Sequence, residues 1–119
     1  MTTKVVYTGA DDEISVTANI VTWDDVNKKD VVTPIPFVDN GTSKIEVSFA
    51  DQVKDSVEHS DMISFDNTGN IVLKLNSLTT VVKNRSYPAT VKVFDDTHPL
   101  GQTIIAPSRE DSNLSLIFK

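Results

Sequence analysis

The 119-residue sequence predicts an all-β fold, an antiparallel sandwich of about seven to nine short strands in a single domain over residues 1–119. Three observations lead to this prediction. Apolar and polar residues alternate with a period of two along much of the chain, segments rich in turn-forming residues separate these stretches, and no long segment has the period of a helix. The chain is long enough to bury one core and contains no internal repeat or linker.

Five segments show the alternation most clearly. They are residues 13–20, 44–49, 70–75, 87–93 and 113–118. In the first, every second residue from Ile14 to Ile20 is apolar, which predicts that this side faces the core. In the last, Leu114 and Leu116 are the clearest inward candidates. Shorter candidate strands fill the gaps at residues 5–7, 31–33, 62–65 and 103–106.

One segment departs from the strand pattern. Phe49, Val53 and Val57 are spaced four apart, which allows one short helical turn near residues 50–57 or an irregular loop. Two aromatic residues are candidates to anchor the ends of the core, Trp23 and Tyr87. Tyr87, at the start of a late strand, has two interpretations: plain core packing, or a corner-type hydrogen bond to nearby backbone.

The arrangement of these strands is predicted to be immunoglobulin-like. Short strands separated by turns are typical of such sandwiches, although a small barrel gives a similar pattern. The disulfide of antibody domains is absent because the chain has no cysteine. The same absence excludes a thiolate zinc site and a cysteine nucleophile.

The charge balance bears on the class of partner. Asp and Glu number 17 against 11 Lys and Arg, a formal net charge of −6, and no basic stripe with interleaved aromatic residues offsets it. Such a surface repels a phosphate backbone, so we expect no nucleic-acid partner. The sequence shows neither a signal-peptide core nor a transmembrane run, so we expect a soluble protein made in the cytoplasm, without a membrane partner.

The most conspicuous polar cluster is Asp95-Asp96-Thr97-His98. Asp95, Asp96 and His98 are a minority candidate for a calcium or transition-metal site. Adjacent aspartates point in different directions, however, and supply only part of a calcium shell. We favour the alternative in which the cluster ends a strand, Pro99 bends the chain and Gly101 permits its return.

Catalytic signals are weaker still. His59 and Asp61 lie near Ser56 and Ser60, but all four fall within one short polar connection with no glycine-rich elbow beside a serine. We interpret them as a solvated loop. No phosphate-binding loop, dinucleotide fingerprint or zinc-protease motif occurs, so the sequence predicts no enzyme, no catalytic residue and no cofactor.

Edge strands offer another kind of site, because a small sandwich can pair an exposed strand with another chain. The N-terminal arm, residues 1–8, and the C-terminal strand, residues 114–118, are best placed for this unless they close their own sheet. The resulting interaction candidates are Val5, Val6, Tyr7, Trp23, Leu114 and Leu116.

The order of these features resembles a known family. The segments that carry the likeness are ISVTANIV (residues 14–21), KIEVSFA (44–50), SDMISFDNTGNIVLKL (60–75), SYPATVKVFDDTHPLGQT (86–103) and LSLIF (114–118). Together they resemble the small immunoglobulin-like modules of tailed-bacteriophage virion proteins, including the N-terminal domain of baseplate upper proteins and related capsid-decorating or tail modules. Residues 87–101 match best.

This resemblance implies a structural role in a virion, assembled in the bacterial cytoplasm. It implies many copies, a homo-oligomer in the particle, contacts with major capsid or tail and baseplate proteins, and no catalysis. Baseplate proteins of this type carry further domains, so a stand-alone capsid-decorating or tail accessory protein is the closer expectation. A carbohydrate-binding or adhesin-type module remains the alternative, and it requires exposed aromatic residues, for which Trp23 and Tyr7 are the candidates.

Overall fold

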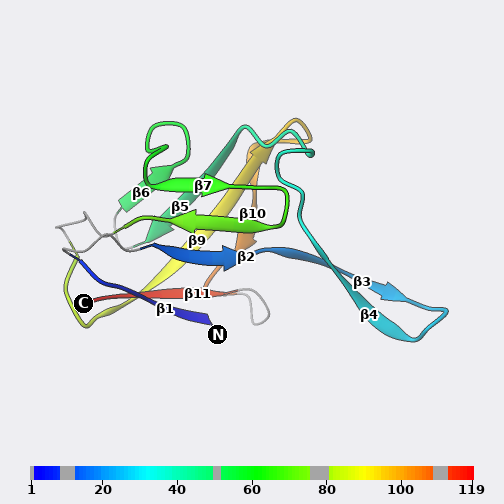
Figure 1. Ribbon diagram of the computed structural model, residues 1–119, viewed down its shortest axis with the longest axis horizontal. Coiled ribbons are helices and arrows are strands. Elements are labelled where there is room, and N and C mark those ends of the chain that lie inside the picture. Colours follow the sequence, from blue (N-terminus) through cyan, green and yellow to red (C-terminus); the bar gives the residue numbers. More distant parts are fainter. Residues whose placement is uncertain (1, 9–12, 50–51, 76–80, 109–112) are drawn as a thin grey trace.

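The computed structural model describes residues 2–8, 13–49, 52–75, 81–108 and 113–119, and within these ranges the secondary structure is entirely β (Figure 1). The chain order of the strands is β1 (Thr2–Val6), β2 (Ile14–Thr17), β3 (Asn19–Asp24), β4 (Lys29–Pro34), β5 (Lys44–Phe49), β6 (Gln52–Asp55), β7 (Ile63–Phe65), β8 (Asn70–Leu73), β9 (Ser86–Asp95), β10 (His98–Ile105) and β11 (Leu114–Phe118). The all-β prediction is therefore confirmed, with more strands than the sequence indicated.

The strands form two larger sheets and one hairpin. The first sheet has the order β1-β11-β9-β5-β6, the second has the order β2-β8-β7, and β3 pairs only with β4. Strand β9 is central in the first sheet. One of its edges pairs with β5; on the other edge, its first half pairs with β11 and its second half with β10. Strand β1 runs parallel to β11, and the remaining pairs are antiparallel.

The core contains inward-facing residues of both larger sheets, an arrangement compatible with a β-sandwich. Its fully buried large side chains are Val6, Phe37, Ile45, Val47, Phe49, Ile63, Ile71, Leu73, Leu75, Leu114, Leu116 and Phe118. Strand β5 shows how the pattern leads to packing, because Ile45, Val47 and Phe49 are buried while the residues between them are partly exposed. Each such side chain contributes about 1.5–3 kcal/mol by leaving water.

Tyr87 occupies one end of this core and has both of its predicted roles. Its ring is buried against Phe118 in an edge-to-face contact with centroids 5.9 Å apart, and Phe118 in turn stacks on Phe49 at 5.8 Å. Its hydroxyl oxygen accepts a hydrogen bond from the backbone N–H of Val82 at 2.8 Å. The predicted corner-type hydrogen bond is confirmed, and it holds the segment that leads into β9 against the sheet.

Three local predictions were wrong. The strand predicted over residues 13–20 ends at Thr17, and β3 leaves the sandwich, so Ile20 and Trp23 are exposed rather than inward. The possible helical turn near residues 50–57 is instead strand β6 followed by a turn. Val53 and Val57 face solvent with exposed fractions of 55% and 64%, so their spacing from Phe49 does not mark a buried face; residues 50–51 lie outside the described residues.

The third difference concerns the turn predicted over residues 95–101. The turn is shorter, because β10 already starts at His98 and pairs there with Asp95. Gly101 lies inside β10, where the register shifts between His98 and Gln102. Its φ is +89°, and a Cβ there would come within 2.8 Å of the Phe94 ring, so the glycine allows the strand to bend over that ring.

Candidate functional site: an exposed hairpin and a cleft at its root

The most distinctive surface feature is the β3–β4 hairpin, residues 19–34, which we call the arm. It extends away from the two packed sheets along the longest dimension of the molecule (Figure 1). The described residues span 50 × 27 × 24 Å. Six consecutive cross-strand pairs, from Asn19 opposite Pro34 to Asp24 opposite Lys29, build the arm.

The tip of the arm is closed by local polar contacts. One carboxylate oxygen of Asp24 accepts hydrogen bonds from the N–H groups of Val26 at 3.0 Å and Asn27 at 3.3 Å. The other accepts one from the Asn27 side chain at 2.8 Å, and these bonds, with the Asn27 side chain as the largest cause, lower the pKa of Asp24. Lys28 adopts a left-handed φ of 52° and pairs with Asp25 at 2.7 Å. The turn is therefore well specified by its own residues.

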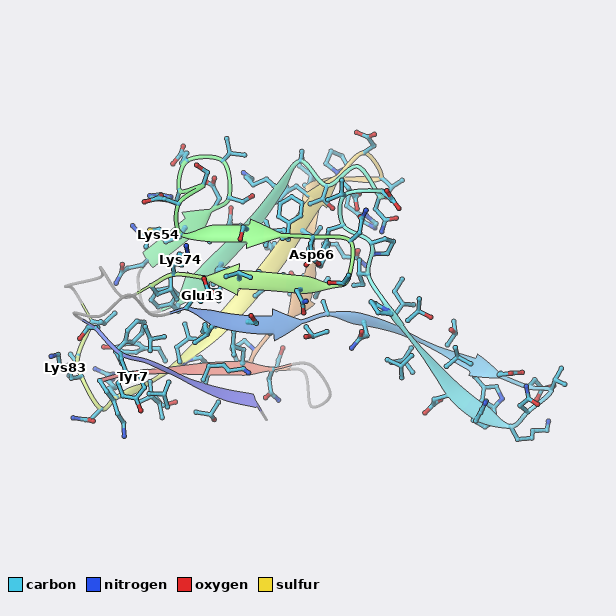
Figure 2. All side chains as sticks on the ribbon, viewed as in Figure 1. Tyr7, Glu13, Lys54, Asp66, Lys74 and Lys83 are labelled. Carbon is cyan, nitrogen blue, oxygen red and sulfur yellow. The ribbon has the colours of Figure 1, made fainter. Side chains whose placement is uncertain are left out.

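The two faces of the arm carry apolar side chains that the other described residues cover only in part. These residues keep between 38% and 89% of their surface exposed, and they are Ile20, Val21, Trp23, Val26, Val31 and Val32. In Figure 2 the side chains of the arm project into solvent on both sides of the ribbon. Val21, Trp23 and Val32 share one face of the hairpin, and exposed apolar side chains grouped in this way are typical of interaction sites.

The root of the arm is fixed to the body by backbone contacts around Ala18. The Ala18 N–H donates to the Gly69 carbonyl at 2.7 Å, and the Ala18 carbonyl accepts from the Ile35 N–H at 3.1 Å. Gly69 has a φ of +78°, and a Cβ there would lie 2.4 Å from the Ala18 carbonyl oxygen. Only glycine fits this turn, because both its backbone conformation and the close approach exclude a side chain.

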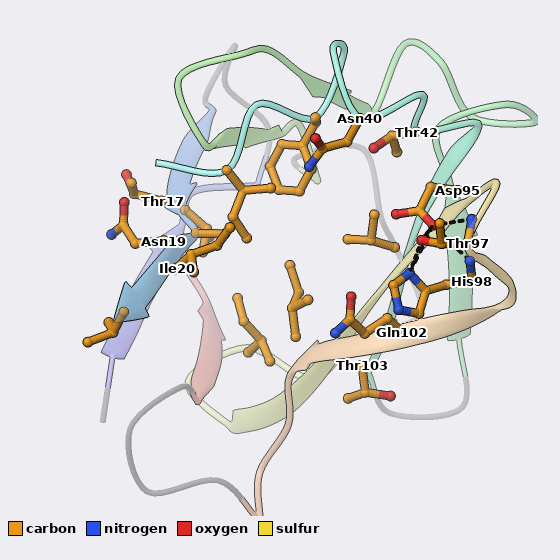
Figure 3. Close-up of a pocket in the computed structure, with 18 of the residues that line it drawn as sticks. Thr17, Asn19, Ile20, Asn40, Thr42, Asp95, Thr97, His98, Gln102 and Thr103 are labelled. Carbon is orange, nitrogen blue, oxygen red and sulfur yellow. Dashed lines mark hydrogen bonds and ion pairs between the residues drawn. The ribbon is translucent and has the colours of Figure 1, made fainter. Parts of the chain in front are cut away.

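A cleft of about 790 Å³ opens at the root of the arm, between β2, the start of β3 and β10 (Figure 3). Apolar side chains such as Phe37, Ile35 and Ile105 line part of it. Its polar lining includes Asn19, Thr17, Asn40, Thr42, Asp95, Thr97, His98, Gln102 and Thr103. The Thr42 hydroxyl oxygen is buried and has no hydrogen-bond partner among the described residues, so it can bond a ligand or water.

The predicted metal candidate lies at one wall of this cleft. A single carboxylate oxygen of Asp95 accepts hydrogen bonds from the Thr97 N–H at 3.1 Å, the Thr97 hydroxyl at 2.9 Å and the His98 N–H at 2.8 Å. The His98 Nδ1 lies 2.9 Å from the same oxygen. The His98 side chain, and then Thr97, hold the pKa of Asp95 below its ordinary value. This oxygen is thus committed to closing the β9–β10 turn, and Asp96 is exposed, which favours the turn interpretation.

A different group brings potential metal ligands together. Among the described residues, Asp55, Glu58 and His59 place one ligand atom each within 4.8 Å of one another. Sequence reasoning missed this group, although the spacing of three and four residues after a strand end was available as a signal. The backbone N–H groups of Glu58 and Val57 bond the Asp55 carboxylate and lower its pKa, with Glu58 the largest cause. Asp55 is therefore engaged in its own turn.

The imagined serine–histidine arrangement does not assemble. The Ser56 hydroxyl oxygen accepts a hydrogen bond from the Ile45 N–H at 2.9 Å, so it ties the loop to β5. The His59 N–H donates to the Asp55 carbonyl, and the buried His59 Nδ1 has no partner among the described residues. Asp61 and Ser60 are exposed. The Ser56 and His59 groups therefore stabilise the conformation of the loop after β6.

Of the two terminal strands, β11 lies between β1 and β9, whereas β1 forms one edge of the first sheet. Val6, Leu114 and Leu116 are buried to within 2% of complete burial, so their side chains cannot contact another chain unless the fold opens. Val5 is partly exposed and Tyr7 is exposed at the end of β1. Of the six interaction candidates, Trp23 has the most prominent surface position, because it lies on the arm with 60% of its surface exposed.

No protein-family model matches the chain, and no curated protein matches it in sequence. Within the described residues, no helix has the length and apolar character needed to cross a bilayer.

Proposed function

We propose that the protein is a non-enzymatic structural component of a tailed-bacteriophage particle, a capsid-decorating or tail and baseplate accessory protein that acts through protein–protein contacts. The observation that carries the proposal is the arm. A two-stranded hairpin is marginally stable alone in water, and this one exposes apolar residues on both faces and pairs with no further strand of the described residues on either edge. A partner that covers the arm would bury its apolar side chains and stabilise it, as expected for a protein that works as part of an assembly.

The strand order supports the immunoglobulin-like part of this proposal. If β2, β8 and β7 are taken as strands B, E and D, then β5, β6 and β9 correspond to C, C′ and F, and β11 with β10 corresponds to G. Tyr87, the second residue of β9, then occupies the position of a tyrosine corner at the start of strand F. The arm is an insertion between strands B and C, and immunoglobulin-like domains carry their binding functions on such connections.

Excision of the arm tests the proposal. Because Ala18 and Ile35 are already hydrogen-bonded at the root, an Asn-Gly turn can replace residues 19–34 without separating the sheets. We expect the armless protein to keep a cooperative thermal unfolding transition and to be lost from particles. The measurement is mass spectrometry of density-purified particles from the phage whose genome encodes the chain, produced with either version.

A matched control changes the surface of the body instead. Val53→Lys adds a charge at an exposed apolar position of β6, far from the arm in sequence, and is expected to be incorporated at the wild-type level. Absence of the wild-type chain from purified particles refutes the virion role. Equal incorporation of the armless and wild-type chains refutes the role of the arm.

The cleft supports one second candidate, a carbohydrate-binding module. Its volume of about 790 Å³ is within the range of small-molecule sites, and its lining combines apolar surface with Asn, Gln and Thr side chains. Calorimetric titration of mono- and oligosaccharides distinguishes the two. Saturable binding that is lost in Asn40→Ala and Gln102→Ala supports this candidate, and no heat at millimolar sugar excludes it.

A further inference from the structure

We propose that the arm binds the arm of a second copy of this chain, through antiparallel pairing of β3 with β3 across a two-fold axis at Thr22. This inference rests on the proposed function, for which it names the first partner. It follows from which edge of the arm is open, from what the paired residues would be, and from the charge and area of the arm.

The two edges of the arm differ. Strand β4 carries Lys29 and Asp30 at one end and Pro34, which has no N–H, at the other. Charged residues and proline are the usual protection of an edge strand against pairing. Strand β3 has no charge from Asn19 to Trp23 and is rich in β-forming residues. The unprotected edge is therefore that of β3.

The register of the hairpin indicates which backbone groups this edge offers. The Ile35 N–H bonds the Ala18 carbonyl, and hydrogen-bonded pairs alternate along an antiparallel ladder. Ile20 and Thr22 then bond inward to β4, which leaves the N–H and C=O groups of Val21 and Trp23 directed outward. These outward groups are what a second strand needs.

A two-fold axis at Thr22 gives favourable pairs at the three central positions, residues 21–23, and sets Ile20 opposite Asp24 of the second copy. It sets Val21 opposite Trp23 of the second copy, Trp23 opposite Val21, and the two Thr22 residues opposite each other. Aromatic–β-branched and Thr–Thr pairs are among the stabilising cross-strand pairs. Val32, which faces Val21 within the hairpin, extends the apolar face on each side. The result is a four-stranded sheet, β4-β3-β3-β4.

Charge and area are consistent with a second copy as the occupant. The arm holds three aspartates and two lysines, a net charge of −1, whereas the chain carries −6, so arms can meet with little repulsion while the acidic bodies stay apart. Pairing along the β3 edge involves only backbone groups and the side chains around Thr22, so each arm would bury less than the roughly 800 Å² per partner of a standard interface. We therefore expect a weak dimer, one that becomes effective when many copies are held on one particle.

Cysteine cross-linking tests the inference, since the chain has no cysteine of its own. Thr22→Cys brings two thiols together at a non-hydrogen-bonded pair, where Cα atoms lie about 4.5 Å apart, within the range for a disulfide. We expect mild oxidation to convert most of this variant into a covalent dimer. Val26→Cys, at the tip of the arm where the wild-type side chain is 89% exposed, is the control and should stay largely monomeric.

Sedimentation of the unmodified full chain between 1 and several hundred micromolar completes the test. We expect a concentration-dependent dimer whose dissociation constant rises at least about tenfold in Val21→Lys and little in Val26→Lys, because lysine on a paired edge blocks strand addition. Equal cross-linking of Thr22→Cys and Val26→Cys, or a monomer at every concentration, overturns the inference. If the chain sediments as a monomer but is present in purified particles, only the arm pairing is refuted. If Thr22→Cys forms the covalent dimer but the chain is absent from purified particles, only the virion role is refuted.

Discussion

Tyr87→Phe removes one oxygen atom from the end of the core and leaves the ring in place. In the wild type this oxygen accepts the Val82 N–H at 2.8 Å in a partly buried contact. A net hydrogen bond contributes about 0.5–1.5 kcal/mol, and a buried N–H left without a partner costs about 1–3 kcal/mol. Because Val82 itself is more than half exposed, water can solvate part of the freed N–H. We therefore expect the free energy of unfolding to fall by about 1–2 kcal/mol.

The assay is urea-induced unfolding followed by circular dichroism. The midpoint should move to lower urea with an unchanged slope, and the melting temperature should fall by about 4–8 °C. Val57→Ala is the control: this side chain is 64% exposed, so its change should stay within about 0.5 kcal/mol. A Tyr87→Phe loss no larger than that of Val57→Ala would show that the hydroxyl does not hold the segment before β9.

Two further predictions concern backbone strain and pH. Gly69→Ala forces a left-handed φ on a residue whose Cβ meets the Ala18 carbonyl, so the free energy of unfolding measured by thermal unfolding should fall by at least about 2 kcal/mol. An unchanged free energy of unfolding would contradict this close contact. The pKa of Asp95 is lowered in the folded state, first by His98 and then by Thr97. Ionised Asp95 therefore stabilises the folded protein at any pH above the unfolded-state pKa, and this stabilisation is lost as the pH falls through the folded-state pKa. Asp95→Asn should flatten the decline of stability between about pH 5 and 2, and an unaltered pH profile in urea titrations argues against that role.

Much of the body could be predicted from local pattern. Strand β5 has the bounds that its alternation indicates, and the long β9 follows from Tyr87, Ala89, Val91 and Val93. These strands pair on both edges and bury one face, so the alternation of apolar and polar residues is sufficient to predict them. The hydroxyl bond of Tyr87 was one of two interpretations that the sequence allowed, beside plain core packing, and the structure shows both.

The arm could not be predicted in this way. Ile20 continues the alternation of Ile14, Val16 and Ala18, and a pattern of side chains does not tell a strand on a core from a strand in solvent. The separation happens at Ala18, where contacts with Gly69, distant in sequence, turn the chain outward. The cleft was equally hidden, since its lining combines residues from β2, β10 and the loop before β5.

Because the hairpin is attached only at its root, a small rotation there moves its tip by a large distance. A six-residue strand spans roughly 20 Å, so a rotation of about 10° at Ala18 would move the tip by roughly 3–4 Å. Two backbone hydrogen bonds, which join Ala18 to Gly69 and to Ile35, would therefore set the angle at which the arm meets a second copy in the proposed pairing. The angle between the two bodies of such a dimer would thus depend on the root of the arm, away from the residues that touch the partner.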